Sequence, residues 1–147
     1  MSFLSNLTAR LPLPNKPSVV EHFFALNIGP TQIKACLWAV DGNRLIVNNI
    51  CSADYKSVDD ILNVADGLLD QALGDSILEP EKILFGVPDG WLVDDDLKPG
   101  YLKLLSSIVK SLELKPMAYV ATSHALAHFL EKKEGAPATT IFLGIEG

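Results

Sequence analysis

Residues 23–51, FFALNIGPTQIKACLWAVDGNRLIVNNIC, decide the fold of this chain. Three apolar runs are separated by two short turn signals, a pattern typical of three antiparallel strands. The first turn, residues 27–31, has Gly and Pro side by side, and the second contains Asp41-Gly42, a two-residue hairpin signal. An ordinary meander without a binding role would have the same pattern. We expect the strands at residues 22–28, 31–40 and 44–51.

Apolar residues recur every three or four positions in three later segments, which predicts amphipathic helices. The first helix begins after Ser57 and ends at Gly74, because serine caps a helix and glycine stops it. The second begins near Pro99, a residue suited to the first turn, and the third follows Thr122 or Ser123. The apolar segments between and after the helices predict strands at residues 82–87, 117–121 and 139–145.

The expected element order is therefore βββ-α-β-α-β-α, followed by one more strand. Each later strand follows a helix, which implies parallel crossover connections. We expect an α/β fold of the ribonuclease H-like type, with a five-stranded mixed sheet and helices on both faces. Its first strand should lie between the second strand and the strand at residues 82–87. We expect a leader at residues 1–20, a lobe at 21–136 and the first strand of a second lobe at 137–147.

Composition limits the classes of function. The chain has 147 residues, 48% of them hydrophobic, and a formal net charge of −6, which suits one domain with a sizeable core. The acidic balance argues against a nucleic-acid partner, which would need clustered Lys and Arg. No apolar run approaches the roughly 20 residues of a membrane-spanning helix. Cys36 and Cys51 fall in expected strands, so we expect buried free thiols in a reducing compartment.

Three short segments leave alternatives open. Apolar residues at positions 3, 4, 7 and 11 fall at helical spacing, which fits either a segment that touches a membrane or partner, or a terminus that packs on the body. Asp94-Asp95-Asp96 is either a cation-binding loop or a solvated loop ahead of a helix. His124 and His128 are either a metal-sharing pair or ordinary histidines, with no third ligand apparent near them. We favour the second alternative in each case.

Residues 24–49, FALNIGPTQIKACLWAVDGNRLIVNN, resemble the first phosphate-binding hairpin of the actin-like ATPase superfamily, most of all that of the PilM and FtsA families of pilus assembly and cell division. Residues 83–88 and 114–130 resemble the segments that lead to the second phosphate-binding hairpin, and residues 139–147 resemble its start. The resemblance covers most of residues 22–147. It implies Mg-ATP bound between two lobes in a full-length parent protein.

Four positions depart from the pattern of that family. Asn27 stands where the family has an Asp that holds magnesium through water, and an amide has no charge to balance the cation. Pro30 stands where Ser or Thr would supply a phosphate-binding N–H. Gly144 aligns with the second metal-linked Asp, and Glu146 places a carboxylate where like charges repel phosphate. These substitutions predict lost or altered ATP hydrolysis.

The resemblance also implies a vestigial phosphate site. Gly29 permits a close approach of backbone to phosphate, and Lys34 matches a lysine common in the PilM hairpin. We expect no catalytic residue and no metal ligand in this chain. The expected site residues are Asn27, Gly29, Pro30, Thr31, Lys34, Gly144, Glu146 and Gly147.

The function that follows from this resemblance is a non-hydrolysing, PilM-like scaffold that docks partner proteins in the cytoplasm, peripheral to the inner face of the membrane. The alternative is an ATP-binding ATPase or kinase lobe whose other half is absent from this chain, and we favour the fragment over a stand-alone relic. A ribonuclease H-like nuclease shares the fold but needs an acid at position 27. The strand at residues 44–51 has no Lys or Pro to guard an exposed edge, which predicts a homodimer or a docked peptide, such as a membrane-protein tail.

Overall fold

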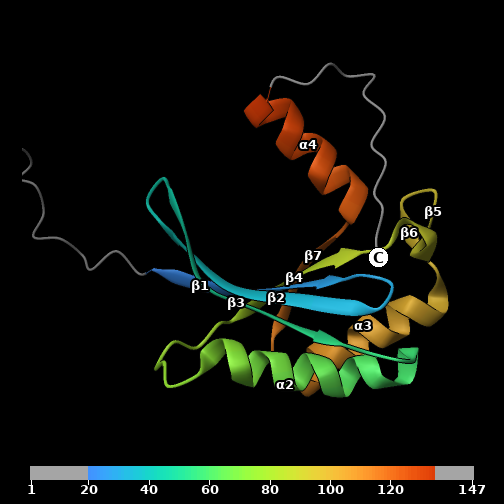
Figure 1. The fold of residues 1–147 in the computed structure, drawn as a ribbon, viewed down its shortest axis with the longest axis horizontal. Coiled ribbons are helices and arrows are strands. Elements are labelled where there is room, and N and C mark those ends of the chain that lie inside the picture. Colours follow the sequence, from blue (N-terminus) through green and yellow to red (C-terminus); the bar gives the residue numbers. More distant parts are fainter. Residues whose placement is uncertain (1–19, 135–147) are drawn as a thin grey trace, which may run out of the picture.

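A five-stranded mixed sheet organises the computed structural model, in which residues 20–134 are described (Figure 1). Its strand order is β3-β2-β1-β4-β7. The first three strands pair antiparallel, whereas β1 pairs parallel with β4 and β4 pairs parallel with β7. The strands are β1 (Glu21–Ile28), β2 (Gln32–Asp41), β3 (Arg44–Asp54), β4 (Lys82–Val87) and β7 (Lys115–Ala121).

The predicted ribonuclease H-like arrangement is confirmed for the described residues. The element order βββ-α-β-α-β-α is as expected, and β1 lies between β2 and β4. The predicted strand at residues 139–145 lies outside the described residues, as does nearly all of the predicted leader.

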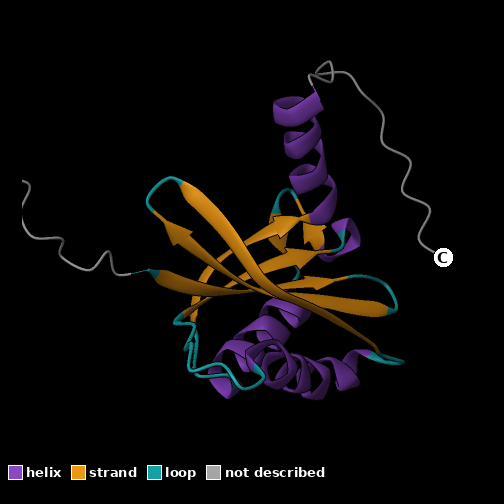
Figure 2. Ribbon diagram, turned by 60° about the vertical axis from the view of Figure 1, so that its left-hand side comes forward, coloured by secondary structure: helices purple, strands orange, loops and turns teal. Residues whose placement is uncertain are grey.

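Two helices cover one face of the sheet and a third stands on the other side (Figures 1 and 2). The helices are α2 (Ile61–Leu73), which follows the 3₁₀ turn η1 (Val58–Asp60), α3 (Pro99–Ser111) and α4 (Thr122–Glu134). The Asp60 carboxylate accepts a hydrogen bond of 3.0 Å from the Ser57 N–H, which fixes the start of this helical segment. Gly74 ends α2 with a φ of +52°, a conformation that favours glycine. Among residues 20–134, no helix is long and apolar enough to cross a bilayer.

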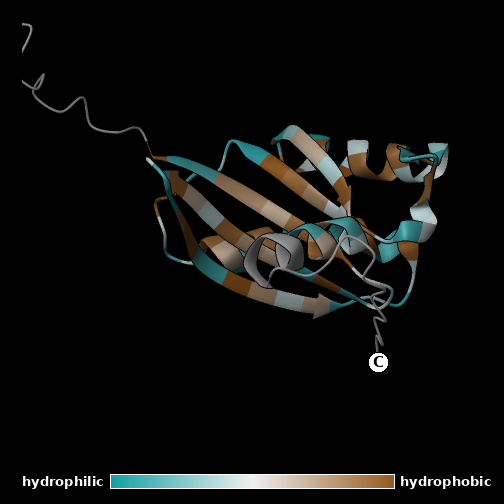
Figure 3. Cartoon of the chain, turned by 90° about the horizontal axis from the view of Figure 1, so that it is seen from above, coloured by the Kyte–Doolittle hydropathy of each residue, from teal (hydrophilic) through white to brown (hydrophobic). Residues whose placement is uncertain are grey.

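The core lies between the sheet and the pair α2 and α3. Alternate residues of β1 point towards these helices, so that Phe24, Leu26 and Ile28 are almost completely buried. Phe24 pairs in register with Leu37 on β2 and with Ile83 on β4, which places it in the middle of the sheet. Figure 3 shows how hydrophobic and hydrophilic residues succeed one another along the strands.

The other face of the sheet is only partly covered. Phe23 is buried because its ring stacks on Trp38 with the centroids 4.3 Å apart. Ala25 and Cys36, which are cross-strand partners, are half-buried. β1 is therefore buried fully on the helix side and in part on this side.

The turn between β2 and β3 differs from the sequence prediction. Asp41 pairs with Arg44, so the two-residue loop is Gly42-Asn43 and not Asp41-Gly42. Gly42 has a φ of +59°, which places the glycine at the first central position of the turn, as in type II′ hairpins.

The acidic triplet is also not a plain loop ahead of a helix. Asp94 and Asp95, with φ values of 49° and 67°, form the turn of a small hairpin between β5 (Leu92–Val93) and β6 (Asp96–Leu97). Both residues at the centre of a two-residue hairpin turn of type I′ need positive φ, and Asp tolerates it better than most residues. The hairpin and the 3₁₀ turn η2 (Asp89–Trp91) lead from β4 to α3, and Trp91 stacks on Tyr101.

Candidate functional site

Polar side chains gather where β1, β4 and β7 end. The carboxyl ends of parallel strands share one edge of a sheet, and this edge is where ligands bind in open α/β sheets. Asn27 is the penultimate residue of β1, and Asp89 follows β4 after one proline. Thr122 and Ser123 come directly after β7, in the first turn of α4. We call these four residues the carboxyl-edge cluster.

The Asn27 side chain is tied to α4. The hydroxyl Oγ1 of Thr122 lies 2.8 Å from Asn27 Oδ1 and 3.2 Å from the carbonyl oxygen of Val87. One hydroxyl donates one proton, so both contacts are full hydrogen bonds when the amide is turned and its nitrogen donates to Thr122. In that arrangement Thr122 donates to Val87, and the contact links β1, β4 and α4 at one point.

Gly86 makes room for this amide. Asn27 and Gly86 pair in register between the parallel strands β1 and β4. A Cβ atom added at Gly86 would lie 2.3 Å from Asn27 Oδ1 and 3.2 Å from its Cγ. A larger residue at this position would displace the Asn27 side chain, which occupies the space above Gly86.

Asp89 and Ser123 form a second tie between β4 and α4. The Ser123 hydroxyl donates a hydrogen bond to Asp89 Oδ1. The contact holds a carboxylate beside the first turn of α4, where the helix dipole stabilises negative charge. The contact engages one oxygen of this exposed carboxylate and helps to hold the helix.

The turn between β1 and β2 uses its own backbone groups. The Gly29 N–H donates to the carbonyl oxygen of Gln32 at 2.9 Å, and Pro30 has no N–H. The Tyr55 hydroxyl donates to the Gly29 carbonyl at 2.5 Å, and the Tyr55 N–H donates to the Thr31 carbonyl at 2.9 Å. The first two residues of the turn thus offer no N–H that is free for a phosphate group.

The expected site residues are brought together in part. Asn27 and Lys34 are cross-strand partners on the same face, and Lys34 is exposed. Residues 29–31 form the adjoining turn. The other three expected residues, Gly144, Glu146 and Gly147, lie outside the described part of the chain.

Sequence reasoning missed Gly86, Asp89, Thr122 and Ser123 as members of the site. Thr122 and Ser123 were expected only as helix caps. The position of all four residues could have identified them, since each lies at or just after the end of a predicted parallel strand. Polar side chains converge at this edge of a sheet. The pairing of Asn27 with Thr122 joins residues 95 positions apart, which local patterns do not reveal.

Residues 20–134 contain no group of three or more His, Cys, Asp or Glu side chains arranged to hold an ion. His124 and His128 are both exposed on α4. The solvated alternative for the acidic triplet fits the exposed side chains at 94–96.

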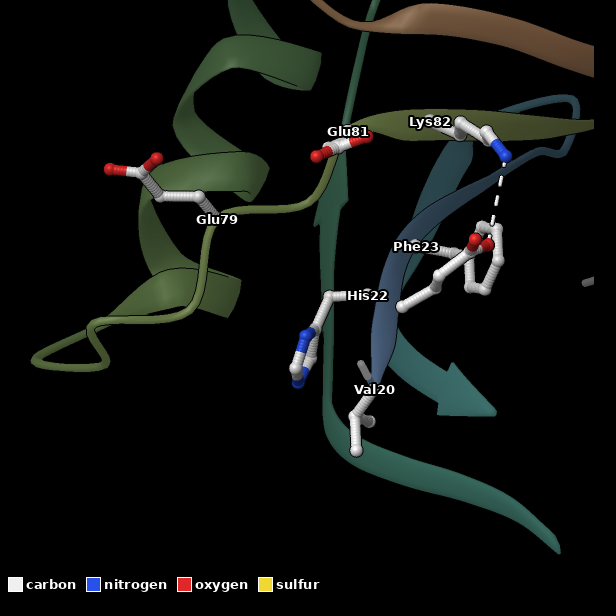
Figure 4. A pocket seen from close by; sticks show the side chains of 7 residues that line it. Val20, His22, Phe23, Glu79, Glu81 and Lys82 are labelled. Atoms are coloured by element: carbon white, nitrogen blue, oxygen red, sulfur yellow. Dashed lines mark ion pairs between the residues drawn. The ribbon is translucent and has the colours of Figure 1, made fainter. Parts of the chain in front are cut away.

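A surface pocket of about 160 Å³ lies at the opposite end of β1 and β4 (Figure 4). Lys82 there forms an ion pair with Glu21, with 3.6 Å between nitrogen and oxygen, and its Nζ lies 5.7 Å from the centre of the Phe23 ring. In Figure 4 the His22 side chain points away from Glu79, so these titratable groups do not converge. The pocket is separate from the carboxyl-edge cluster and belongs to the amino ends of the strands.

Both cysteines are free thiols, as predicted. Burial raises the pKa of Cys36, and the nearby Cys51 raises it further. Burial also raises the pKa of Cys51, whose Sγ lies 3.5 Å from the carbonyl oxygen of Leu68. The reactive species is the thiolate, so these protonated thiols are poor nucleophiles at neutral pH.

No protein-family model and no curated protein matches this chain. Among solved structures, the chain is similar to the Ppx/GppA protein of Aquifex aeolicus at 8% identity with a TM-score of 0.47, covering 76% of this chain and 41% of that one. It is similar to RuvC of Thermus thermophilus at 11% identity with a TM-score of 0.47, and the match covers 80% of this chain and 85% of that one. It is also similar to YeaZ of Pseudomonas aeruginosa at 16% identity with a TM-score of 0.43, and the match covers 79% of this chain and 50% of that one. The chain thus spans less than half of the Ppx/GppA protein. Such distant similarities do not extend to function.

Proposed function

We propose that this chain is a non-hydrolysing, actin-like scaffold domain that docks partner proteins. By resemblance, it would serve a PilM-like role in pilus, secretion or division assembly, in the cytoplasm and peripheral to the inner face of the membrane. The observation that supports this proposal is the tie between Asn27 and Thr122. In the actin-like family, the position of Asn27 holds magnesium.

The chemistry of the carboxyl-edge cluster favours a structural role. A magnesium ion is held by carboxylates, substrate phosphates and ordered water. Asn27 is neutral, and its amide is engaged by the Thr122 hydroxyl. The acid that follows β4, Asp89, is engaged by Ser123. Both groups therefore help to fasten α4 to the sheet, and with no charge at position 27 ATP hydrolysis is not expected.

The hairpin of β2 and β3 offers a surface for partners. Four apolar side chains on one face of it are between 38% and 72% exposed: Val40, Leu45, Val47 and Ile50. Contiguous apolar patches of this kind mark interaction sites on soluble proteins. We call these four residues the β2–β3 patch.

Calorimetric titration with Mg-ATP tests the proposal. We expect a dissociation constant weaker than about 1 mM, which corresponds to about −4 kcal/mol, because the site lacks the charges that hold magnesium. A dissociation constant in the low micromolar range, about −8 kcal/mol, would instead favour the alternative of an ATP-binding ATPase or kinase lobe.

A pair of substitutions tests the same site. By the family resemblance, Asn27→Asp combined with Gly144→Asp supplies both metal-linked acids, so we expect the pair to restore magnesium binding. Asn43→Asp in the exposed turn between β2 and β3 adds one of these charges at the opposite end of the sheet from Asn27 and serves as the control. Equal magnesium affinity in the control and the paired variant would contradict the assignment of the site.

A further inference from the structure

The β2–β3 patch lies on the face of the sheet that points away from α2 and α3. Cross-strand partners share a face, so Val40 lies beside Leu45, and Trp38 lies between Val47 and Phe23. The four side chains of the patch are between 38% and 72% exposed, and Trp38 is half-buried. The one described helix on this side of the sheet, α4, lies against β4 and β7 and leaves the patch uncovered.

The first residues of the chain join the sheet beside this patch. Residues 1–19, most of the expected leader, lie outside the described residues. Val20 directly precedes β1, and Glu21, the first residue of β1, pairs in register with Val40 of the patch. Residues directly opposite each other in antiparallel strands lie about 4.5–5.5 Å apart. The segment before Val20 is therefore tethered at the border of the patch.

The length of this segment matches the patch. Residues 1–11 carry the apolar side chains at helical spacing and would span about 17 Å as a helix, at 1.5 Å per residue. Leu45 and Ile50, the ends of the patch along β3, are also about 17 Å apart at 3.3 Å per residue. Residues 12–19 reach up to about 26 Å when extended, which is enough to return the segment over the sheet.

The charges around the tether are complementary. Residues 1–19 contain two basic residues and no acid, so they carry +2, and the other residues carry −8 of the total of −6. Glu79 and Glu81 line the same small pocket as Val20, and both are exposed and have no ion pair among the described residues. Lys16 stands four positions before Val20, at most about 13 Å along the chain, so its ammonium group can reach these two acids.

We propose that residues 1–19 fold back and cover the β2–β3 patch of the same chain. The side chains that contact the patch are the apolar ones at positions 3, 4, 7 and 11, and Lys16 lies beside Glu79 and Glu81. A segment on a short tether has an effective concentration in the millimolar range, so it occupies the patch ahead of a dilute second copy. A partner that docks on the patch has to displace this segment. The inference depends on the patch and the tether, and not on the proposed function.

Tryptophan fluorescence of the intact chain is the first test. The chain has two tryptophans, and Trp91→Phe leaves Trp38, which lies beside the patch, as the reporter. Replacing both Leu7 and Leu11 by lysine should lower the docked population at least about tenfold, because two apolar side chains lose their contacts. We therefore expect acrylamide to quench Trp38 more strongly in this variant than in its parent.

A matched variant carries lysine in place of Ser5 and Ala9. It adds the same charge at the same spacing, on the opposite side of the helical pattern, and we expect its Trp38 quenching to equal that of the parent. Cooperative thermal unfolding of all three chains shows that the sheet is intact. Equal quenching in all three would overturn the proposal. Loss of binding to phosphatidylglycerol vesicles in the Leu7 and Leu11 variant, with Trp38 unchanged, would also overturn it and assign the segment to a membrane.

Disulfide trapping locates the segment. Leu7→Cys is combined with Val47→Cys in a chain that carries Cys36→Ser, since the other native thiol, Cys51, is buried. We expect mild oxidation to link positions 7 and 47 within one chain. The control has Ile46→Cys in place of Val47→Cys, because Ile46 is 41% exposed, against 50%, but lies on the opposite face of β3. Equal linkage to positions 46 and 47, or linkage between two chains only, would overturn the proposal.

Discussion

Replacing Phe24 by alanine is expected to lower the free energy of unfolding by about 3–5 kcal/mol, the largest effect on stability that we predict. Phe24 has no exposed surface. Its neighbours in register, Leu37 and Ile83, come from strands on both sides of β1 and are themselves buried. The space left by the ring is therefore walled by two strands that are held in place, and it cannot collapse completely.

Denaturant unfolding monitored by circular dichroism measures this loss. Ile77→Ala is the control, because a residue that is 96% exposed has few contacts to lose, and such surface changes stay within about 0.5 kcal/mol. A loss below about 1.5 kcal/mol for Phe24→Ala would show that the surroundings relax into the cavity. Domains of this kind are stable by about 5–15 kcal/mol in total, so the expected loss is a large part of that margin.

Replacing Gly86 by alanine is expected to destabilise the chain by about 1–3 kcal/mol, because the added methyl group displaces the Asn27 amide. The new Cβ would lie 2.3 Å from Oδ1 of that amide, far closer than real contacts allow. The side chain must swing away, and its contact with the Thr122 hydroxyl is then broken. Thermal or denaturant unfolding measures the loss.

A double-mutant cycle separates this explanation from a general cost of losing glycine. In a chain that already carries Asn27→Ala, the added methyl group at position 86 meets no amide, so we expect it to cost less than about 0.5 kcal/mol. Gly67→Ala is the control, since Gly67 is a helical glycine of α2 with open space around it. That substitution should stabilise the chain by up to about 1 kcal/mol. An undiminished cost of Gly86→Ala beside Asn27→Ala would contradict the proposed clash.

Local sequence patterns predicted the helices and strands because interactions between residues close in sequence largely determine them. The apolar stripe of α2 and its end at Gly74 follow from helical periodicity and from a backbone conformation that suits glycine. The parallel pairing of β4 and β7 was expected from the connections, since parallel neighbours need crossover connections and these usually contain a helix. Turn positions were less certain: Asp41-Gly42 and Gly42-Asn43 are both hairpin signals, and only the register between Asp41 and Arg44 decides between them.

The candidate site was only partly predictable because its contacts are distant in sequence. Asn27 was identified through a family resemblance, but its partner Thr122 was expected only to cap a helix. Gly86 gave no signal of its own, because a glycine in a strand has several explanations. A bulge in β3 was also unexpected. Leu37 pairs with Asn49 and the next residue, Trp38, pairs with Val47, so Asn48 is an extra residue that no glycine or proline marks in the sequence.

The position of β1 in the sheet has a consequence for the route by which the chain folds. β1, β2 and β3 are joined by short loops, so their contacts close over a few residues and form early. Phe24 contacts Ile83 only after α2 and its connecting loops have returned the chain to the sheet, so that β4 can pair with β1. Thr122 lies 95 positions from Asn27 in the sequence. We therefore expect the meander to form first, β4 to complete the hydrophobic layer, and α4 to be fastened last. Destabilising the Asn27–Thr122 tie should then speed unfolding more than it slows folding, because this contact forms after the rate-limiting barrier.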